Sequence, residues 1–192
     1  MNKKTRALTD EQYINIIRTL QNGFVHSKGS VFKPNKRIAA ILVIEANLGL
    51  RISDVLKLRL YEIVRDGNGY RLDIIEQKTQ KKRTFTVPIE IYSYIQEYAL
   101  ENNINPKARL FPVSERTVQH QLKVVCDYLG YQGIGTHSFR KYFATDVYVN
   151  NNYNIELVRT LLQHSSVVTT QRYIGIQSEQ VENALKKHVK LL

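Results

Sequence analysis

Cysteine and tryptophan are almost missing from this sequence. Its 192 residues contain one cysteine, Cys126, and no tryptophan. A single cysteine cannot form an intrachain disulfide, so we expect a reducing compartment and predict a cytoplasmic protein. Cys126 lies in an apolar run with Val124, Val125 and Leu129, which is typical of a small buried thiol rather than a reactive one. The charged N-terminus also lacks the apolar core of a signal peptide.

Long apolar runs and acidic residues are scarce as well. No stretch approaches the ~18 residues that a membrane-spanning helix needs, so no membrane partner is expected. Lys and Arg number 28 against 17 Asp and Glu, which gives a formal net charge of +11. This excess favours a polyanionic partner, because each phosphate that a cation neutralises releases counterions. A basic protein with no nucleic-acid role would have the same composition, so charge alone does not decide.

The first quarter of the sequence has the periodicity of helices. A capping-box pattern at Thr9–Gln12 predicts the start of the first helix. Pro34 suits the first turn of a second helix, which is apolar on most sides and is therefore expected in the core. Gly49 is expected to end that helix. Helices are expected over about 9–22 and 34–48 and from about 53, with a loop at 24–33.

The middle of the sequence changes to an alternating pattern with turn signals at Asp66–Gly69 and at a lysine-rich tip, Lys78–Lys82. Pro88 ends this part and opens another helix. Strands are expected over about 61–64, 70–75 and 83–87, and further helices over 88–98, 114–129, 137–150, 155–163, 167–174 and 178–192. The prediction is a mainly α fold with a small three-stranded antiparallel β-sheet (α+β), in a single domain.

Two arginines and a histidine could bind a phosphate. Arg51 lies at a helix-to-helix junction, where its rigid fork of donors can point out of the fold. Taken alone, Arg51 is better explained as a surface arginine paired with Asp54 or Glu45. His137 and Arg140 are spaced i, i+3 on one helix face, where Arg140 could hold a phosphate oxygen and His137 could exchange a proton. A capping histidine beside a solvated arginine is the commoner explanation of that spacing.

The remaining candidates are His164, Tyr173 and Lys78. His164 ends a predicted helix, where the helix dipole would favour it whatever its function. Tyr173 follows nine residues later, so one short helix could present its hydroxyl back toward His164, although the chain has twelve tyrosines. Lys78 lies at the tip between the second and third strands and could reach a DNA groove, or could simply be a solvated turn residue. Separately each signal is weak.

In combination these residues resemble a known family. Five motifs occur in order: Gly49–Asp54, Lys78 followed by Val87-Pro88, His137-x-x-Arg140 with Phe143–Thr145, Leu162-x-His164, and Thr169-Thr170-x-x-Tyr173. The order and spacing closely resemble the catalytic domain of the tyrosine recombinases, the phage-integrase family, from about Leu8 to Tyr173. The resemblance implies that the fold is that of this catalytic domain and that the activity is DNA strand breakage and rejoining.

The resemblance also implies which residues carry the chemistry. Tyr173 would attack the scissile phosphate and form a 3′-phosphotyrosyl link, while Arg51 and Arg140 would neutralise charge on the non-bridging oxygens. His137 would be the general base for the tyrosine hydroxyl, and His164 would donate a hydrogen bond to the phosphate.

Lys78 would protonate the departing 5′ oxygen. No metal or other cofactor is expected, because the family needs none and the sequence offers no carboxylate cluster to hold one.

The resemblance sets the expected organisation and partners. We expect one catalytic domain over 1–192, with a basic segment at 1–7, no separate N-terminal DNA-clamping domain, and a helix at 178–192 that packs on a neighbouring protomer or on its own core. The partners would be double-stranded DNA and further copies of the chain, as a dimer or tetramer on DNA. Phosphate contacts are expected from lysines and arginines near 78–83 and from Lys33, Lys36 and Arg37.

Two departures from the family pattern are expected to be peripheral: Gln163 in place of a usual glycine, and Lys141 in place of a further histidine. The activity would be integration, excision or resolution. A relaxing topoisomerase of type IB shares the chemistry, but the short chain and the Thr169-Thr170-x-x-Tyr173 pattern argue against it. A non-catalytic DNA-binding regulator derived from an integrase is the alternative from another class.

Overall fold

The computed structural model contains fourteen elements in the part of the chain that it describes. The described residues are 5–26, 29–75, 78, 80, 82–174, 186 and 188. The helices are α1 (Asp10–Asn22), α2 (Lys36–Leu48), α3 (Ile52–Val55), the 3-10 helix η1 (Leu60–Glu62), α4 (Ile89–Glu101), α5 (Glu115–Tyr128), α6 (Thr136–Asn150), α7 (Ile155–Leu162) and α8 (Val167–Tyr173). The strands are β1 (Phe24–Val25), β2 (Val31–Phe32), β3 (Ile63–Asp66), β4 (Gly69–Ile75) and β5 (Lys82–Val87).

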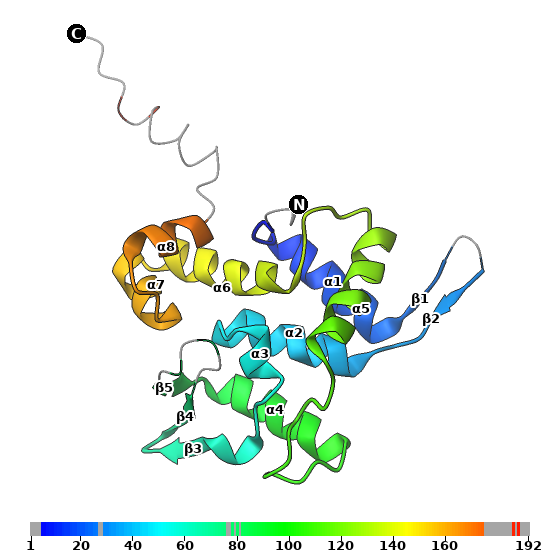
Figure 1. Cartoon of the computed structure of the whole chain (residues 1–192), viewed down its shortest axis with the longest axis horizontal. Helices are drawn as coiled ribbons and strands as arrows, with labels where there is room; N and C mark the ends of the chain where they lie inside the picture. The colour runs from blue at the N-terminus through cyan, green and yellow to red at the C-terminus, as the bar shows by residue number, and fades with distance from the viewer. Residues whose placement is uncertain are drawn as a thin grey trace.

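Helix α2 is the centre of the core. Nine of its thirteen residues are buried, so it has no solvent-facing stripe, as its apolar sequence predicts. It packs against α1, α3, α4, α5 and α6, and in Figure 1 it lies between α6 and α4. Its side-chain cap is Asn35, whose Oδ1 accepts a hydrogen bond from the Ile38 N–H. Pro34 therefore precedes the helix instead of lying in its first turn, because Asn35 supplies the oxygen that a helix start needs.

The other caps follow the sequence closely. Thr9 and Gln12 form the expected reciprocal capping box at the start of α1, and Ser114 accepts from the Thr117 N–H at the start of α5. Each cap satisfies backbone donors that have no partner inside the helix. No helix in the described ranges is long and apolar enough to cross a membrane.

The expected three-stranded antiparallel sheet is present in the order β3-β4-β5. Leu72 of β4 pairs with Ile63 on one side and Phe85 on the other, and is fully buried. Its first strand begins two residues later than expected, because Tyr61 and Glu62 belong to η1. The sheet packs on η1 and α4.

The loop expected at 24–33 is instead a small antiparallel hairpin, β1–β2, in which Phe24 pairs with Phe32. The Phe24 ring stacks on the Phe32 ring at 4.9 Å and on the Tyr128 ring of α5 at 3.8 Å. Aromatic stacking supports strands of only two residues, which are too short to show an alternating pattern. The helix expected at 178–192 lies outside the described residues, apart from two positions.

A second, smaller apolar cluster joins α7 and α8 to the C-terminal half of α6. It comprises Ala144, Val158, Leu162 and Ile174, and in Figure 1 it lies at the end of the molecule farthest from the β1–β2 hairpin. The contact of α6 with both α2 and α7 brings the end of α2 close to the end of α7. The candidate site lies at this meeting point.

Gly49, which ends α2, is expected to tolerate no side chain. Its φ is +55°, and an added Cβ would lie 2.4 Å from Cδ1 of Phe143. Gly49→Ala should therefore lower the free energy of unfolding by about 2–4 kcal/mol, from left-handed strain plus overpacking, as measured by urea denaturation. Gly67→Ala is the matched control, because Gly67 has φ +58° with nothing within 4 Å. Equal losses of unfolding free energy in the two variants would show that the Phe143 ring moves aside without a measurable cost.

Candidate active site

Arg140 joins the ends of two helices at the centre of the site. Its side chain, from the first half of α6, is fully buried. One guanidinium nitrogen donates to the carbonyl of Gly49, and the other donates to the carbonyl of Leu162 at 2.9 Å. Both carbonyls belong to helix C-termini, where oxygens have no partner within the helix. Arg140 thus holds the end of α2 against the end of α7 with charge-assisted hydrogen bonds.

Arg51 lies two residues after Gly49, at the N-cap of α3. Its side chain is half-buried and makes no cap hydrogen bond. The contact between Arg140 and Gly49 therefore brings Arg140 to the junction that carries Arg51. The structure places two arginines from distant parts of the sequence in one region.

His164 and Tyr173 lie in the turn and helix that follow α7. The His164 Nδ1 atom is 3.1 Å from the Thr170 hydroxyl oxygen, and the backbone N–H of His164 donates to the Arg159 carbonyl at 3.0 Å. The ring of Tyr173, the last residue of α8, packs edge-on against the His164 imidazole with 4.8 Å between ring centroids. The single short helix between them thus returns the tyrosine to the histidine, as the nine-residue spacing predicts.

His137 occupies the first turn of α6, and its side chain reaches solvent. Partial desolvation lowers its pKa, and the positive charges of Arg140, Lys78 and Lys141 lower it further, against an opposing effect of Glu115. The imidazole is therefore neutral at pH 7. Lys78 is thus near enough to His137 to lower its pKa.

The six predicted residues differ in accessibility. Lys78 and His137 are exposed, and Arg51 and Tyr173 are half-buried. His164 is 7% exposed and Arg140 is 0% exposed. An incoming phosphate would therefore meet the first four before the last two, and it would reach Arg140 only after neighbouring groups move. The i, i+3 spacing of His137 and Arg140 predicted a shared helix face, but it could not reveal that one lies in solvent and the other in the core.

Two residues that were expected to be peripheral lie at the site. The Lys141 ammonium is 5.7 Å from the centroid of the Tyr173 ring and donates to the carbonyl of Thr5. Gln163 caps α7 with φ +52° and donates from Nε2 to the Lys82 carbonyl at 3.3 Å. The positive φ of Gln163 could have been predicted from the sequence, because a position where the family usually has glycine often requires positive φ. Its bond to β5 could be found only from the structure.

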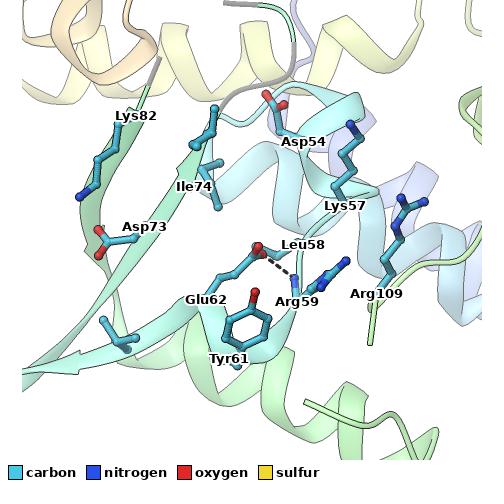
Figure 2. A pocket seen from close by; sticks show the side chains of 12 residues that line it. Asp54, Lys57, Leu58, Arg59, Tyr61, Glu62, Asp73, Ile74, Lys82 and Arg109 are labelled. Carbon is cyan, nitrogen blue, oxygen red and sulfur yellow. Dashed lines mark hydrogen bonds between the residues drawn. The ribbon is translucent and has the colours of Figure 1, made fainter. Parts of the chain in front are cut away.

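The cavity shown in Figure 2 lies beside this site and not within it. It has a volume of about 900 Å³ and is lined by residues of α3, η1 and the sheet. Asp54 and Lys82 line one end, and Tyr61 and Arg109 line the other. None of the six predicted residues lines it. The cavity is therefore not the candidate reaction centre.

Comparison with known proteins identifies relatives of the chain. The probable integrase/recombinase YoeC of Bacillus subtilis (strain 168) is 32% identical over 164 residues, which cover 83% of this chain and 88% of that protein. Tyrosine recombinase XerC of Bradyrhizobium diazoefficiens is 32% identical over 154 residues, which cover 76% of this chain and 47% of that protein. The chain thus spans most of YoeC but about half the length of the XerC relatives it matches.

The same fold occurs in a solved recombinase structure. The XerH site-specific recombinase, in a post-cleavage complex with palindromic difH substrate, matches with a TM-score of 0.74 and 20% identity over 96% of this chain and 53% of that chain. The expected fold, mainly α with a small antiparallel sheet, is confirmed. The profile described as the phage integrase family matches residues 6–180. The resemblance predicted from the five motifs is thereby confirmed, and the chain belongs to the phage integrase family.

Proposed function

We propose that this protein is a site-specific tyrosine recombinase that cuts and rejoins double-stranded DNA through a 3′-phosphotyrosyl intermediate on Tyr173. The observation that carries the proposal is the pair of hydrogen bonds from Arg140 to the Gly49 and Leu162 carbonyls. These bonds bring the segment that contains Arg51 close to the segment in which His164 contacts Tyr173. Family membership supports the activity. The net charge of +11 supports a DNA partner.

The proposed chemistry is a phosphoryl transfer to tyrosine. The phenolic oxygen of Tyr173 forms a bond to phosphorus as the bond to the 5′ oxygen of the next nucleotide breaks. Arg51 and Arg140 stabilise the charge that builds on the non-bridging oxygens, and His164 donates a hydrogen bond to one of them. Attack by a 5′-hydroxyl on the phosphotyrosine reverses the step and rejoins a strand.

Proton transfer is assigned to the two exposed groups. His137 has a lowered pKa and is neutral at pH 7, so it can accept the phenolic proton of Tyr173. Lys78, on the β4–β5 connection, carries a proton that it can give to the departing 5′ oxygen. The exposure of both side chains fits groups that first meet the DNA.

The organisation of the protein is part of the same proposal. Residues 1–192 act as a catalytic domain, further copies assemble with it on DNA, and residues 178–192 pack on a neighbouring copy or on their own domain. A cytoplasmic location is consistent with Cys126, which is buried and whose pKa burial raises to about 12. Such a thiol is protonated and poorly reactive.

A nicked suicide DNA substrate tests the proposal. A nick near the cleavage point lets the released 5′-hydroxyl fragment diffuse away, so the covalent complex accumulates and is seen as a shifted band on a denaturing gel. We expect label on the strand 5′ of the break to stay with the protein and label on the other side to be lost. Binding without any covalent band would favour a non-catalytic DNA-binding regulator.

Gln163→Gly should separate stability from activity. Glycine relieves the cost of φ +52°, so the free energy of unfolding should rise by up to about 1 kcal/mol. Cleavage should slow severalfold, because the hydrogen bond from Gln163 to the Lys82 carbonyl, which joins the end of α7 to the start of β5, is lost. Urea denaturation and the rate of covalent-complex formation measure the two effects. Asn152→Gly is the matched control, since Asn152 has φ +53°, and it should gain stability with an unchanged cleavage rate.

A further inference from the structure

Glu45 is a carboxyl group inside the core that the proposed chemistry does not use. It belongs to α2 and is fully buried, and within the described part of the chain neither of its oxygens has a hydrogen-bond partner. An ionised carboxylate in such a place is costly. Burial accordingly raises the pKa of Glu45 well above its ordinary value. A proton on this group is thus available at a pH where surface carboxylates have none.

The charges that act on Glu45 come from the candidate active site and from α5. Arg140 of α6 favours its ionised form, and Glu115 at the start of α5 opposes it. Glu45 lies one helical turn before Gly49, whose carbonyl accepts a hydrogen bond from Arg140. Because α2 and α6 pack directly and both side chains are fully buried, the charge of Arg140 acts on the Glu45 carboxyl inside the core.

The other helices that pack on α2 carry titratable groups, and experiments must distinguish their proton uptake from that of Glu45. The phenols of Tyr13 on α1 and Tyr94 on α4 have raised pKa values through burial, to about 12 for Tyr94, so they stay neutral below pH 9. Asp54 on α3 is a buried carboxyl, 5% exposed. His137 titrates as well, but its lowered pKa confines its proton uptake to acidic pH.

We propose that Glu45 is a positioning residue for Arg140, and that its carboxyl takes up a proton when a DNA phosphate binds at Arg140. The inference rests on the proposed role of Arg140 as a phosphate ligand. While Glu45 is ionised, it is the anionic neighbour of the guanidinium and cancels part of the field that a phosphate would experience. A phosphate is a second anion in the same low-dielectric region, where like charges repel strongly. Protonation of Glu45 removes this repulsion and directs the full charge of Arg140 to the phosphate.

The sign of the pH effect follows from this competition. Bound phosphate raises the pKa of Glu45 above its value in the free protein, so binding is coupled to proton uptake between these two pKa values. DNA affinity is then high at low pH and weakens as pH rises through the window. The limit for one linked proton is a tenfold change in affinity per pH unit. Glutamine has the shape of the protonated acid but cannot titrate.

Affinity measurements across pH test the inference. Anisotropy titrations with a labelled DNA site from pH 5.5 to 9 should show a Kd that rises with pH for the natural protein. The Kd of Glu45→Gln should stay at the value that the natural protein has at low pH and should not rise above pH 6.5. Glu62→Gln is the matched control, because Glu62 is also a carboxyl whose pKa burial raises, but it lies by the cavity of Figure 2, hydrogen-bonded to the Arg59 N–H. It should follow the natural profile.

Several outcomes would overturn the inference. An unchanged pH profile in Glu45→Gln would remove the role of Glu45, and a flattened profile in Asp54→Asn alone would assign the proton to Asp54. If Glu45→Gln does not fold, the ¹³C carboxyl resonance of Glu45 in the natural protein decides: its titration midpoint should rise on DNA binding, and a fixed midpoint contradicts the inference.

The covalent complex on nicked DNA is measured in parallel. If the natural protein forms the covalent band but Glu45 takes up no proton on DNA binding, only the role of Glu45 is contradicted. If no covalent band forms, the recombinase proposal itself is contradicted.

Discussion

Replacing Arg140 by alanine is expected to abolish strand cleavage and to lower the free energy of unfolding by about 3–5 kcal/mol. Arg140 is fully buried and holds the carbonyls of Gly49 and Leu162 together. Alanine would remove both charge-assisted hydrogen bonds and leave the two carbonyls and Glu45 without their cationic neighbour. Covalent-complex formation on nicked DNA measures the loss of cleavage, and urea denaturation measures the loss of stability.

Two further variants separate the structural and chemical parts of this loss. Arg140→Lys keeps a buried cation but not the planar fork, so it should recover part of the stability and little of the cleavage rate. Arg51→Ala should lose several orders of magnitude in cleavage with a much smaller loss of stability, because Arg51 is only half-buried whereas Arg140 is fully buried. An Arg140→Ala protein as stable as Arg51→Ala would contradict the assignment of Arg140 as the tie between α2 and α7.

Tyr173→Phe should reduce covalent-complex formation by roughly 10⁴-fold or more, the scale seen when a nucleophile is removed. Its stability should stay within about 0.5 kcal/mol of the natural protein, because phenylalanine keeps the ring contacts with His164 and Lys141. Gel assays of the nicked substrate and urea denaturation make the comparison.

Tyr153→Phe is the matched control for this loss. The Tyr153 ring also packs edge-on, against Tyr148 at 5.4 Å, but its side chain is 57% exposed and lies in the turn between α6 and α7. It should cleave at the natural rate. Equal activity of Tyr173→Phe and Tyr153→Phe would show that Tyr173 is not the nucleophile.

The helices and the main sheet could be predicted from the sequence because their signals are local. Thr9 and Ser114 are caps with one side-chain oxygen and one nearby N–H, and the three-stranded sheet follows from alternation between clear turns. The β1–β2 hairpin could not be predicted, because its support is the stacking of Phe24 on Tyr128, about a hundred residues later.

The sequence could predict one contact between candidate site residues, but not the environments of those residues. Spacing linked His164 to Tyr173 through one short helix, and the structure has that contact. The burial of Arg140 depends on the distant carbonyls of Gly49 and Leu162, which no local pattern reveals. Glu45 is hidden for the same reason, since a single glutamate in an apolar helix has no periodicity of its own.

Mass spectrometry of the protein–DNA complex tests the central claim most directly. The complex trapped on nicked DNA would be digested with trypsin and nuclease, and the nucleotide-bearing peptide would be sequenced. The account predicts a 3′-nucleotide phosphate on the hydroxyl of Tyr173, in the peptide that follows Arg172. A nucleotide on any other residue, or one joined through its 5′ phosphate, would contradict it.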